Sequence, residues 1–163
     1  MSALTLNDIG FEDRIFNTGS SKSSNHLAEL IKLSLNHYEE PVSLQRKSRS
    51  LASLQDFFNE HSTENWDGYG ALPLSNDALA DCKEFLKNIP ADVSFPDLIP
   101  EPSGGIGFQW KKSKDWVFIV SFKGNNILSY AGIFGAGNKN HGQHIFRNSI
   151  PKIILENIKR IIV

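Results

Sequence analysis

Apolar residues recur every three or four positions in the first part of the chain, the spacing that places side chains on one face of an α-helix. One such run lies between Leu27 and Tyr38, and we expect Pro41 to end it because proline interrupts helical hydrogen bonding. A second run begins near Ser50. The pattern therefore predicts two amphipathic helices. Their apolar residues are Leu27, Leu30, Ile31, Leu35 and Tyr38, and then Leu51, Leu54, Phe57 and Phe58.

A third helix is predicted between Ser75 and Pro90. Ser75 is a favourable N-cap, and Leu74 before it can pack on Leu79 one turn into the helix. Cys82 falls within the apolar stripe, which predicts a small buried side chain rather than a reactive thiol. The stripe consists of Ala78, Leu79, Cys82, Phe85, Leu86 and Ile89.

The apolar period changes to two after the prolines at 90–102, as expected for half-buried strands. Three strands are predicted, over 106–110, 116–122 and 127–134, with Gly124-Asn125 as a hairpin turn. Residues 135–142 are predicted to be a loop, and 144–148 a short fourth strand. Ser149-Ile150-Pro151 then opens a helix that we expect to cover the sheet.

The order of these elements predicts the α+β class: N-terminal helices, an antiparallel meander of three to four strands, and a C-terminal helix packed on the sheet. Residues 1–24 are expected to be a flexible or loosely docked leader. Residues 25–163 are expected to form one domain. Its parts are a helical part (25–90), a Pro-rich connector (91–104) and a sheet with its helix (105–163).

Composition adds few constraints on function. The chain has 163 residues and a single cysteine, a length typical of one domain with an adequate core. One cysteine cannot close an intrachain disulfide, and no apolar run is long enough to span a bilayer. The N-terminus also lacks the pattern of a signal peptide. We therefore expect a cytoplasmic protein with no membrane contact.

Charge is divided unevenly along the chain. Residues 1–102 contain 8 basic and 16 acidic residues, whereas residues 103–163 contain 9 basic and 2 acidic ones, although the net charge is only −1. Two interpretations follow. The two parts neutralise each other in the fold, or the second part presents a basic face to an acidic protein or a phosphate backbone.

The most distinctive motif is Asn65-Trp66-Asp67-Gly68-Tyr69-Gly70-Ala71-Leu72-Pro73. Its two glycines favour a tight turn with positive φ, with both rings packed under it and Asp67 capping backbone donors. This structural interpretation is a rigid corner between two helices. The functional one is a contact loop, because two aromatic rings beside a carboxylate offer stacking and hydrogen bonding.

With the strand Gly104-Gly105-Ile106-Gly107-Phe108-Gln109-Trp110 and the hairpin over 116–130, this motif resembles a family of small uncharacterised bacterial proteins. The likeness covers Glu64 to the C-terminus. The chain departs from the family where Gln109, rather than an acidic residue, precedes Trp110. The resemblance implies a bacterial source, often in mobile or accessory DNA, and no established activity.

Candidate chemistry is sparse. His141 and His144 have an H-x-x-H spacing, but no third metal ligand is close in sequence, and no nucleotide or nucleophile motif is present. We therefore expect no metal and no cofactor. A small enzyme with a site near Asp67, His141 and His144 stays an alternative, although we favour a protein without catalytic residues.

Lysines cluster between Trp110 and Trp116, a combination that also suits nucleic acid. The leading hypothesis is a bacterial or mobile-element accessory protein that binds a protein partner, in an antitoxin-like, immunity-like or anti-defence role. Nucleic-acid binding by the basic sheet is an alternative, and the sequence does not indicate the oligomeric state. The candidate contact residues are Trp66, Asp67, Tyr69, Lys111, Lys112, Lys114, Asn138, Lys139 and His141.

Overall fold

The computed structural model describes residues 22–162, so the leader expected over 1–24 lies almost entirely outside the described residues. The chain divides into two units, Met1–Gln45 and Arg46–Val163. Helix α2 (Lys22–Glu60) runs from the first unit into the second. Every contact described below lies within Arg46–Val163.

The expected break at Pro41 was wrong, because α2 is a single helix of 39 residues. Proline removes one backbone N–H donor and costs about 3 kcal/mol in a helix interior. That local cost is small beside the many backbone hydrogen bonds that a helix of 39 residues can form, so the proline does not end it.

Helix α3 (Asn76–Asn88) confirms the prediction of a capped third helix. The Ser75 side chain accepts a hydrogen bond from the backbone N–H of Asp77, 3.2 Å away. Its apolar stripe is buried, Cys82 included. The helix ends at Asn88, just before Pro90.

The sheet contains five strands rather than the expected three to four. They follow one another as an antiparallel meander in the order β1-β2-β3-β4-β5. The strands are β1 (Asp97–Pro100), β2 (Ile106–Ser113), β3 (Trp116–Phe122), β4 (Ile127–Phe134) and β5 (Lys139–Ile145). The three central strands, β2 to β4, confirm the alternation seen in the sequence.

The two edge strands lie where the sequence suggested irregular structure. Strand β1 is part of the segment expected to be a Pro-rich connector, and edge strands accept proline because one side of their backbone needs no partner. Strand β5 occupies the second half of the expected loop over 135–142 and ends at Ile145, so it starts earlier and ends earlier than the fourth strand predicted over 144–148. Its Gly142 leaves room for the Tyr130 ring, since an added Cβ would lie 2.8 Å from the hydroxyl oxygen.

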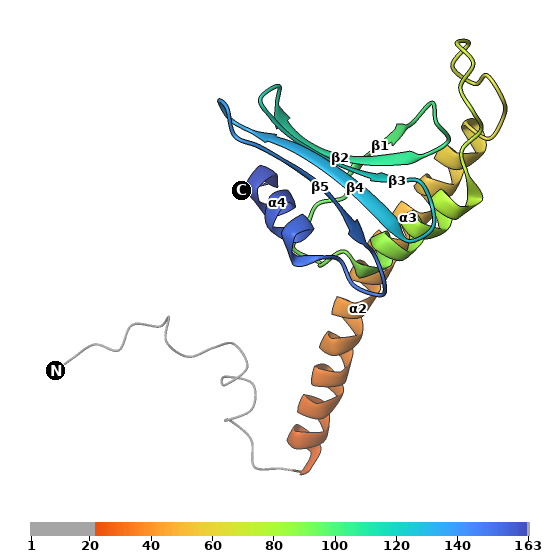
Figure 1. Ribbon diagram of the computed structural model, residues 1–163. Helices are drawn as coiled ribbons and strands as arrows, with labels where there is room; N and C mark the ends of the chain where they lie inside the picture. The colour runs from red at the N-terminus through yellow and green to blue at the C-terminus, as the bar shows by residue number, and fades with distance from the viewer. Residues whose placement is uncertain (1–21, 163) are drawn as a thin grey trace. The chain divides into compact units, whose positions relative to one another are not determined.

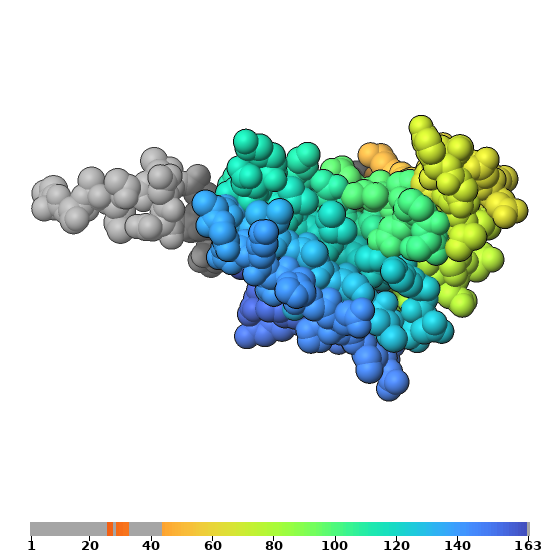
Figure 2. All heavy atoms as spheres, turned by 45° about the horizontal axis from the view of Figure 1, so that its top comes forward, coloured from red at the N-terminus to blue at the C-terminus, as the bar shows by residue number. Residues whose placement is uncertain are grey.

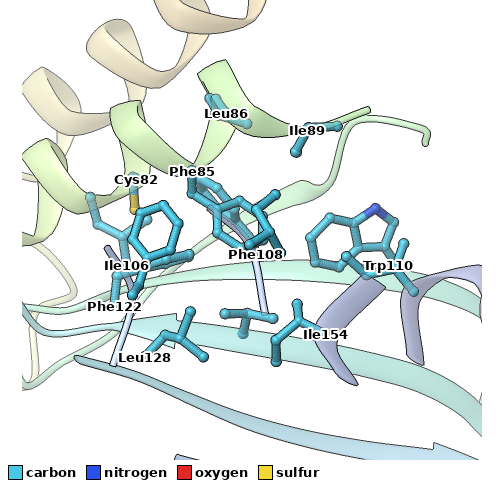
Figure 3. Packing of buried hydrophobic residues seen from close by; sticks show 14 of the residues in the cluster. Cys82, Phe85, Leu86, Ile89, Ile106, Phe108, Trp110, Phe122, Leu128 and Ile154 are labelled. Atoms are coloured by element: carbon cyan, nitrogen blue, oxygen red, sulfur yellow. The ribbon is translucent and has the colours of Figure 1, made fainter. Parts of the chain in front are cut away.

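Helices α3 and α4 (Lys152–Ile162) lie on one side of the sheet and confirm the predicted C-terminal helix (Figure 1). Phe85 of α3 is fully buried between the helix and the sheet, with its ring 5.1 Å from that of Phe122 and 5.8 Å from that of Phe108 (Figure 3). Ile154 and Ile158 of α4 are buried in the same core.

None of the helices that the structure describes combines the length and the apolar character required to cross a bilayer.

Candidate functional site

The side of the sheet opposite α3 and α4 is referred to here as the open face. No helix of Arg46–Val163 lies over it among the described residues, and Figure 2 turns this side forward. Pleating places odd-numbered residues of the strands on this face, while even-numbered residues such as Phe108 and Val120 point to the core. The open face consists of Asp97, Ile99, Gly107, Gln109, Lys111, Val117, Ile119, Ser121, Ile127, Ser129, Ala131, Ile133, Lys139, His141, Gln143 and Ile145.

Two of the predicted contact residues, Lys111 and Lys139, lie at the two ends of one row of paired residues that crosses the open face. Lys111 pairs with Val117, Val117 with Ile133, and Ile133 with Lys139. Three strand spacings separate the two lysines, about 14 Å between their backbones. His141 lies in the adjacent row, opposite Ala131. The row is therefore an apolar centre with a cation at each end.

The remaining predicted residues of this region are placed differently. The register between β2 and β3 shifts between Lys111 and Ser113. Lys112 lines a surface depression of about 670 Å³ beside α4, together with Trp116 and Arg160. Lys114 lies in the exposed β2–β3 turn, and Asn138 lies in the β4–β5 turn. The basic cluster is consequently split between the two sides of the sheet.

Three exposed isoleucines on the open face were not among the predicted contact residues. The exposed fractions are 45% for Ile127, 38% for Ile133 and 64% for Ile145. Ile127 and Ile145 pair directly across β4 and β5. The sequence could have indicated two of them. Ile127 and Ile133 are odd-numbered, whereas the core residues Leu128 and Phe134 of the same strand are even-numbered, so the two isoleucines point to the opposite face.

All aromatic residues of β2, β3 and β4 point away from the open face. Trp110, Phe118 and Phe134 are buried beneath the helices, and Tyr130 packs against the same core. The cation of Arg160 lies 3.9 Å from the centre of the Phe134 ring on that side. The open face therefore offers aliphatic, amide, hydroxyl and basic groups, the carboxylate of Asp97 and the imidazole of His141, but none of the Phe, Trp or Tyr rings of β2–β4.

The Trp66 motif forms a turn closed by its own hydrogen bonds. One oxygen of Asp67 accepts the backbone N–H groups of Tyr69, at 2.7 Å, and Ala71, at 3.1 Å. The Trp66 indole N–H donates to the carbonyl of Leu72, at 2.9 Å. Gly68 adopts the positive φ that the sequence predicted, at 76°. The expected packing of both rings was wrong for Tyr69, whose side chain is 95% exposed.

This turn lies at the opposite end of β2 from the lysines. The backbone N–H of Leu72 donates to the carbonyl of Pro102, in the turn that leads into β2, at 2.9 Å. Lys111 is five residues beyond the start of β2, about 17 Å along an extended strand. The structure therefore does not join Tyr69 and Lys111 into one patch.

The residues of the alternative enzymatic site are also apart. His141 is on the open face, whereas His144 pairs with Leu128 and stacks on Tyr130, with ring centres 6.0 Å apart. Asp67 is engaged in its own turn. Among the described residues, no group of three or more His, Cys, Asp or Glu side chains is arranged to hold a metal ion.

Cys82 lies in the core rather than in a site. Its side chain is fully buried, and burial raises the pKa of the Cys82 thiol well above its usual value. The negative charges of Asp81 and Glu101 raise this pKa further. The thiol therefore stays protonated, as expected for a small core residue.

Among the described residues, an ion pair between Lys159 and Asp92 joins the acidic and basic parts of the chain. Lys159 of α4 lies 2.9 Å from Asp92, and this hydrogen bond lowers the pKa of the Asp92 carboxyl. The pairs Lys87–Glu84 and Lys152–Glu156 each stay within one part. Lys111 and Lys139 of the open face belong to none of these three pairs.

These features define an α+β protein in which the described helices α3 and α4 cover one side of a five-stranded antiparallel sheet. Comparison of the chain with protein-family models, curated proteins and solved structures gives no match. The resemblance through the Trp66 motif therefore stays a hypothesis.

Proposed function

We propose that the chain acts by binding a partner protein through the open face of its sheet. The observation that carries this proposal is the row in which Lys111 and Lys139 flank Val117 and Ile133. Exposed apolar side chains mark interaction surfaces, and cations at their border select partners with acidic groups. Ile127 and Ile145 form a second apolar pair on the same face, three rows away, about 20 Å along the strand from Ile133.

A protein partner fits this face better than a nucleic acid. Proteins that bind single strands on a sheet stack bases on aromatic side chains, and the aromatic residues of β2–β4 point to the core instead. In the alternative function, nucleic-acid binding, Lys111 and Lys114 would contact the phosphate groups. If changing Lys111, Lys112 and Lys114 to Glu removes retention on DNA or RNA, a nucleic acid has to be considered as the partner.

Recovery of a partner from the native host tests the proposal. Ile133→Ser on the open face and Ile162→Ser on α4 form a matched pair, because their side chains are 38% and 37% exposed. Affinity purification should recover one protein in near-stoichiometric amount. We expect Ile133→Ser and Lys139→Glu to reduce this recovery about tenfold, the effect of removing a contact of about 1.4 kcal/mol.

Ile162→Ser should leave recovery unchanged. The proposal fails if no protein is recovered with the wild type, or if the loss follows Ile162→Ser rather than Ile133→Ser.

The proposal extends to the biological role of this binding. The Trp66 motif resembles bacterial accessory proteins, which suggests an antitoxin-like, immunity-like or anti-defence role in the bacterial cytoplasm. A toxin or defence gene adjacent to the gene for this chain would support that role and identify the partner to be tested.

A further inference from the structure

The two edges of the sheet differ in how open they are to another strand. Strand β1 has four residues, ends at Pro100 and directly follows Pro96. Prolines and short length are features that discourage strand addition at an edge. Strand β5 has seven residues and no proline. An additional strand is therefore better accommodated at β5.

The hydrogen bonds that flank β5 show which of its backbone groups point outward. Phe134 N–H donates to the Asn138 carbonyl at 2.8 Å, and Phe146 N–H donates to the Asn126 carbonyl at 2.7 Å. Even-numbered residues of β5 therefore face β4 along the ladder, since bonding alternates in antiparallel pairs. The backbone N–H and C=O groups directed away from the sheet belong to Lys139, His141, Gln143 and Ile145.

The side chains of these outward-bonding residues all project onto the open face. A strand added beside β5 would place alternate side chains next to them, within about 5 Å. Ile145, with Ile127 behind it, would meet an apolar residue of the added strand. Lys139 lies at the other end of the edge and would meet an acidic one.

Charge argues against a second copy of this chain as the added strand. Residues 135–149 contain Lys139, Arg147 and two histidines but no Asp or Glu. Two β5 strands side by side would bring these basic segments together, and like charges across an interface are unfavourable. An acidic segment is complementary to the same edge.

We propose that β5 receives an extended acidic segment of the partner as a sixth strand, with apolar residues at alternate positions facing Ile145 and Ile127. This inference rests on the proposed function and names the chemistry of its partner. Main-chain hydrogen bonds supply the affinity in such strand addition, and side chains at alternate positions supply the specificity.

Selection from a library of random displayed peptides tests the inference without knowledge of the partner. Peptides selected on the wild-type chain should be acidic, should alternate apolar and polar residues, and should bind less tightly as salt concentration rises. Failure to select peptides, or selection of neutral or basic ones, overturns the inference.

Two substitutions at Gln143 distinguish backbone pairing from side-chain contact. Gln143→Pro removes an outward N–H that β4 does not use, whereas Gln143→Thr keeps that N–H; both lose the hydrogen bond from Gln143 to Ser129. We expect Gln143→Pro to weaken binding of a selected peptide at least about tenfold, because a strand hydrogen bond is lost and the ring blocks close approach. Gln143→Thr should bind like the wild type. Equal binding by a folded Gln143→Pro variant, or equal loss in both variants, overturns strand addition.

Amide hydrogen exchange provides a second measurement that does not depend on the proline variant folding. The amides of His141, Gln143 and Ile145 should exchange more slowly when the peptide is bound; unchanged exchange overturns the inference. The outcome is separable from that of the proposed function. If Ile133→Ser loses the host partner while Gln143→Pro retains it, the open face binds the partner without an added strand.

Discussion

The carboxylate of Asp81 in α3 accepts a hydrogen bond, 3.1 Å long, from the backbone N–H of Asn126 in the β3–β4 turn. Asn125 and Asn126 both have positive φ, at 64° and 57°, so this turn has a demanding backbone conformation. The Asp81 side chain is 8% exposed. Burial raises the pKa of Asp81, the hydrogen bond from Asn126 lowers it, and nearby Asp77 raises it, with a net upward shift.

Asp81→Asn should remove one component of the pH dependence of stability. A folded-state pKa above the unfolded value of about 3.9 means that the native state binds more protons, so this group lowers stability as pH rises through the interval between the two pKa values. Asparagine does not ionise, yet its side-chain oxygen can accept the same hydrogen bond.

Urea unfolding of wild type and Asp81→Asn between about pH 3.5 and 7 measures this difference. We expect the variant to gain stability relative to the wild type as pH rises through that interval. A relative loss over the same interval would contradict the assigned direction of the Asp81 shift.

Phe85→Ala should be severely destabilising. Phe85 is fully buried, and its ring lies within 6.4 Å of those of Phe108, Trp110, Phe122 and Phe146. Removing a buried aromatic side chain typically costs about 3–5 kcal/mol of unfolding free energy. Tyr69→Ala is the control, because an exposed side chain away from such packing should change stability by less than about 0.5 kcal/mol. Denaturant titration measures both.

Gly68→Ala should destabilise the Trp66 turn by backbone strain alone. Gly68 has φ of 76°, and an added Cβ would meet no atom within 4 Å. The left-handed region costs an L-residue about 1–2 kcal/mol, and less for asparagine. Thermal unfolding should therefore rank stability as wild type, then Gly68→Asn, then Gly68→Ala. Equal melting temperatures for all three would show that this turn does not contribute to cooperative unfolding.

Zinc should not stabilise the protein. A strand places residues three apart on opposite faces, so His141 and His144 do not converge on one ion. The melting temperature should be the same with zinc and with a chelator, since a ligand bound specifically to the folded state would raise it. His144→Ala is the control: zinc stabilisation that disappears in this variant would indicate a site that the described geometry does not contain.

The central part of the fold followed from local sequence pattern. Apolar residues in β2–β4 alternate with a period of two, and only a strand buries all of them on one face. The apolar stripe of α3 has the spacing of three or four residues that only a helix buries on one face. The break predicted at Pro41 failed because a local preference of about 3 kcal/mol does not decide the state of a 39-residue helix.

The edge strands and the open face required tertiary information. Strand β5 contains asparagine, glycine and histidine and has no apolar alternation; its pairing with β4 and the position of Gly142 beneath Tyr130 are long-range effects. The row from Lys111 to Lys139 joins residues 28 positions apart through two intervening strands, which no local spacing reveals.

The sequence by itself determined that helices and an antiparallel meander form an α+β fold with a C-terminal helix on the sheet, because burial of apolar side chains imposes a period on each element. It also determined the closed turn at Trp66, since the positive φ of its glycines and the short side chain of Asp67 are local properties. Only the tertiary structure decided that Lys111 and Lys139 share a face, that His141 and His144 do not, and that β5 is an edge of the described sheet. Those relationships depend on strand register and sheet order, which long-range packing fixes.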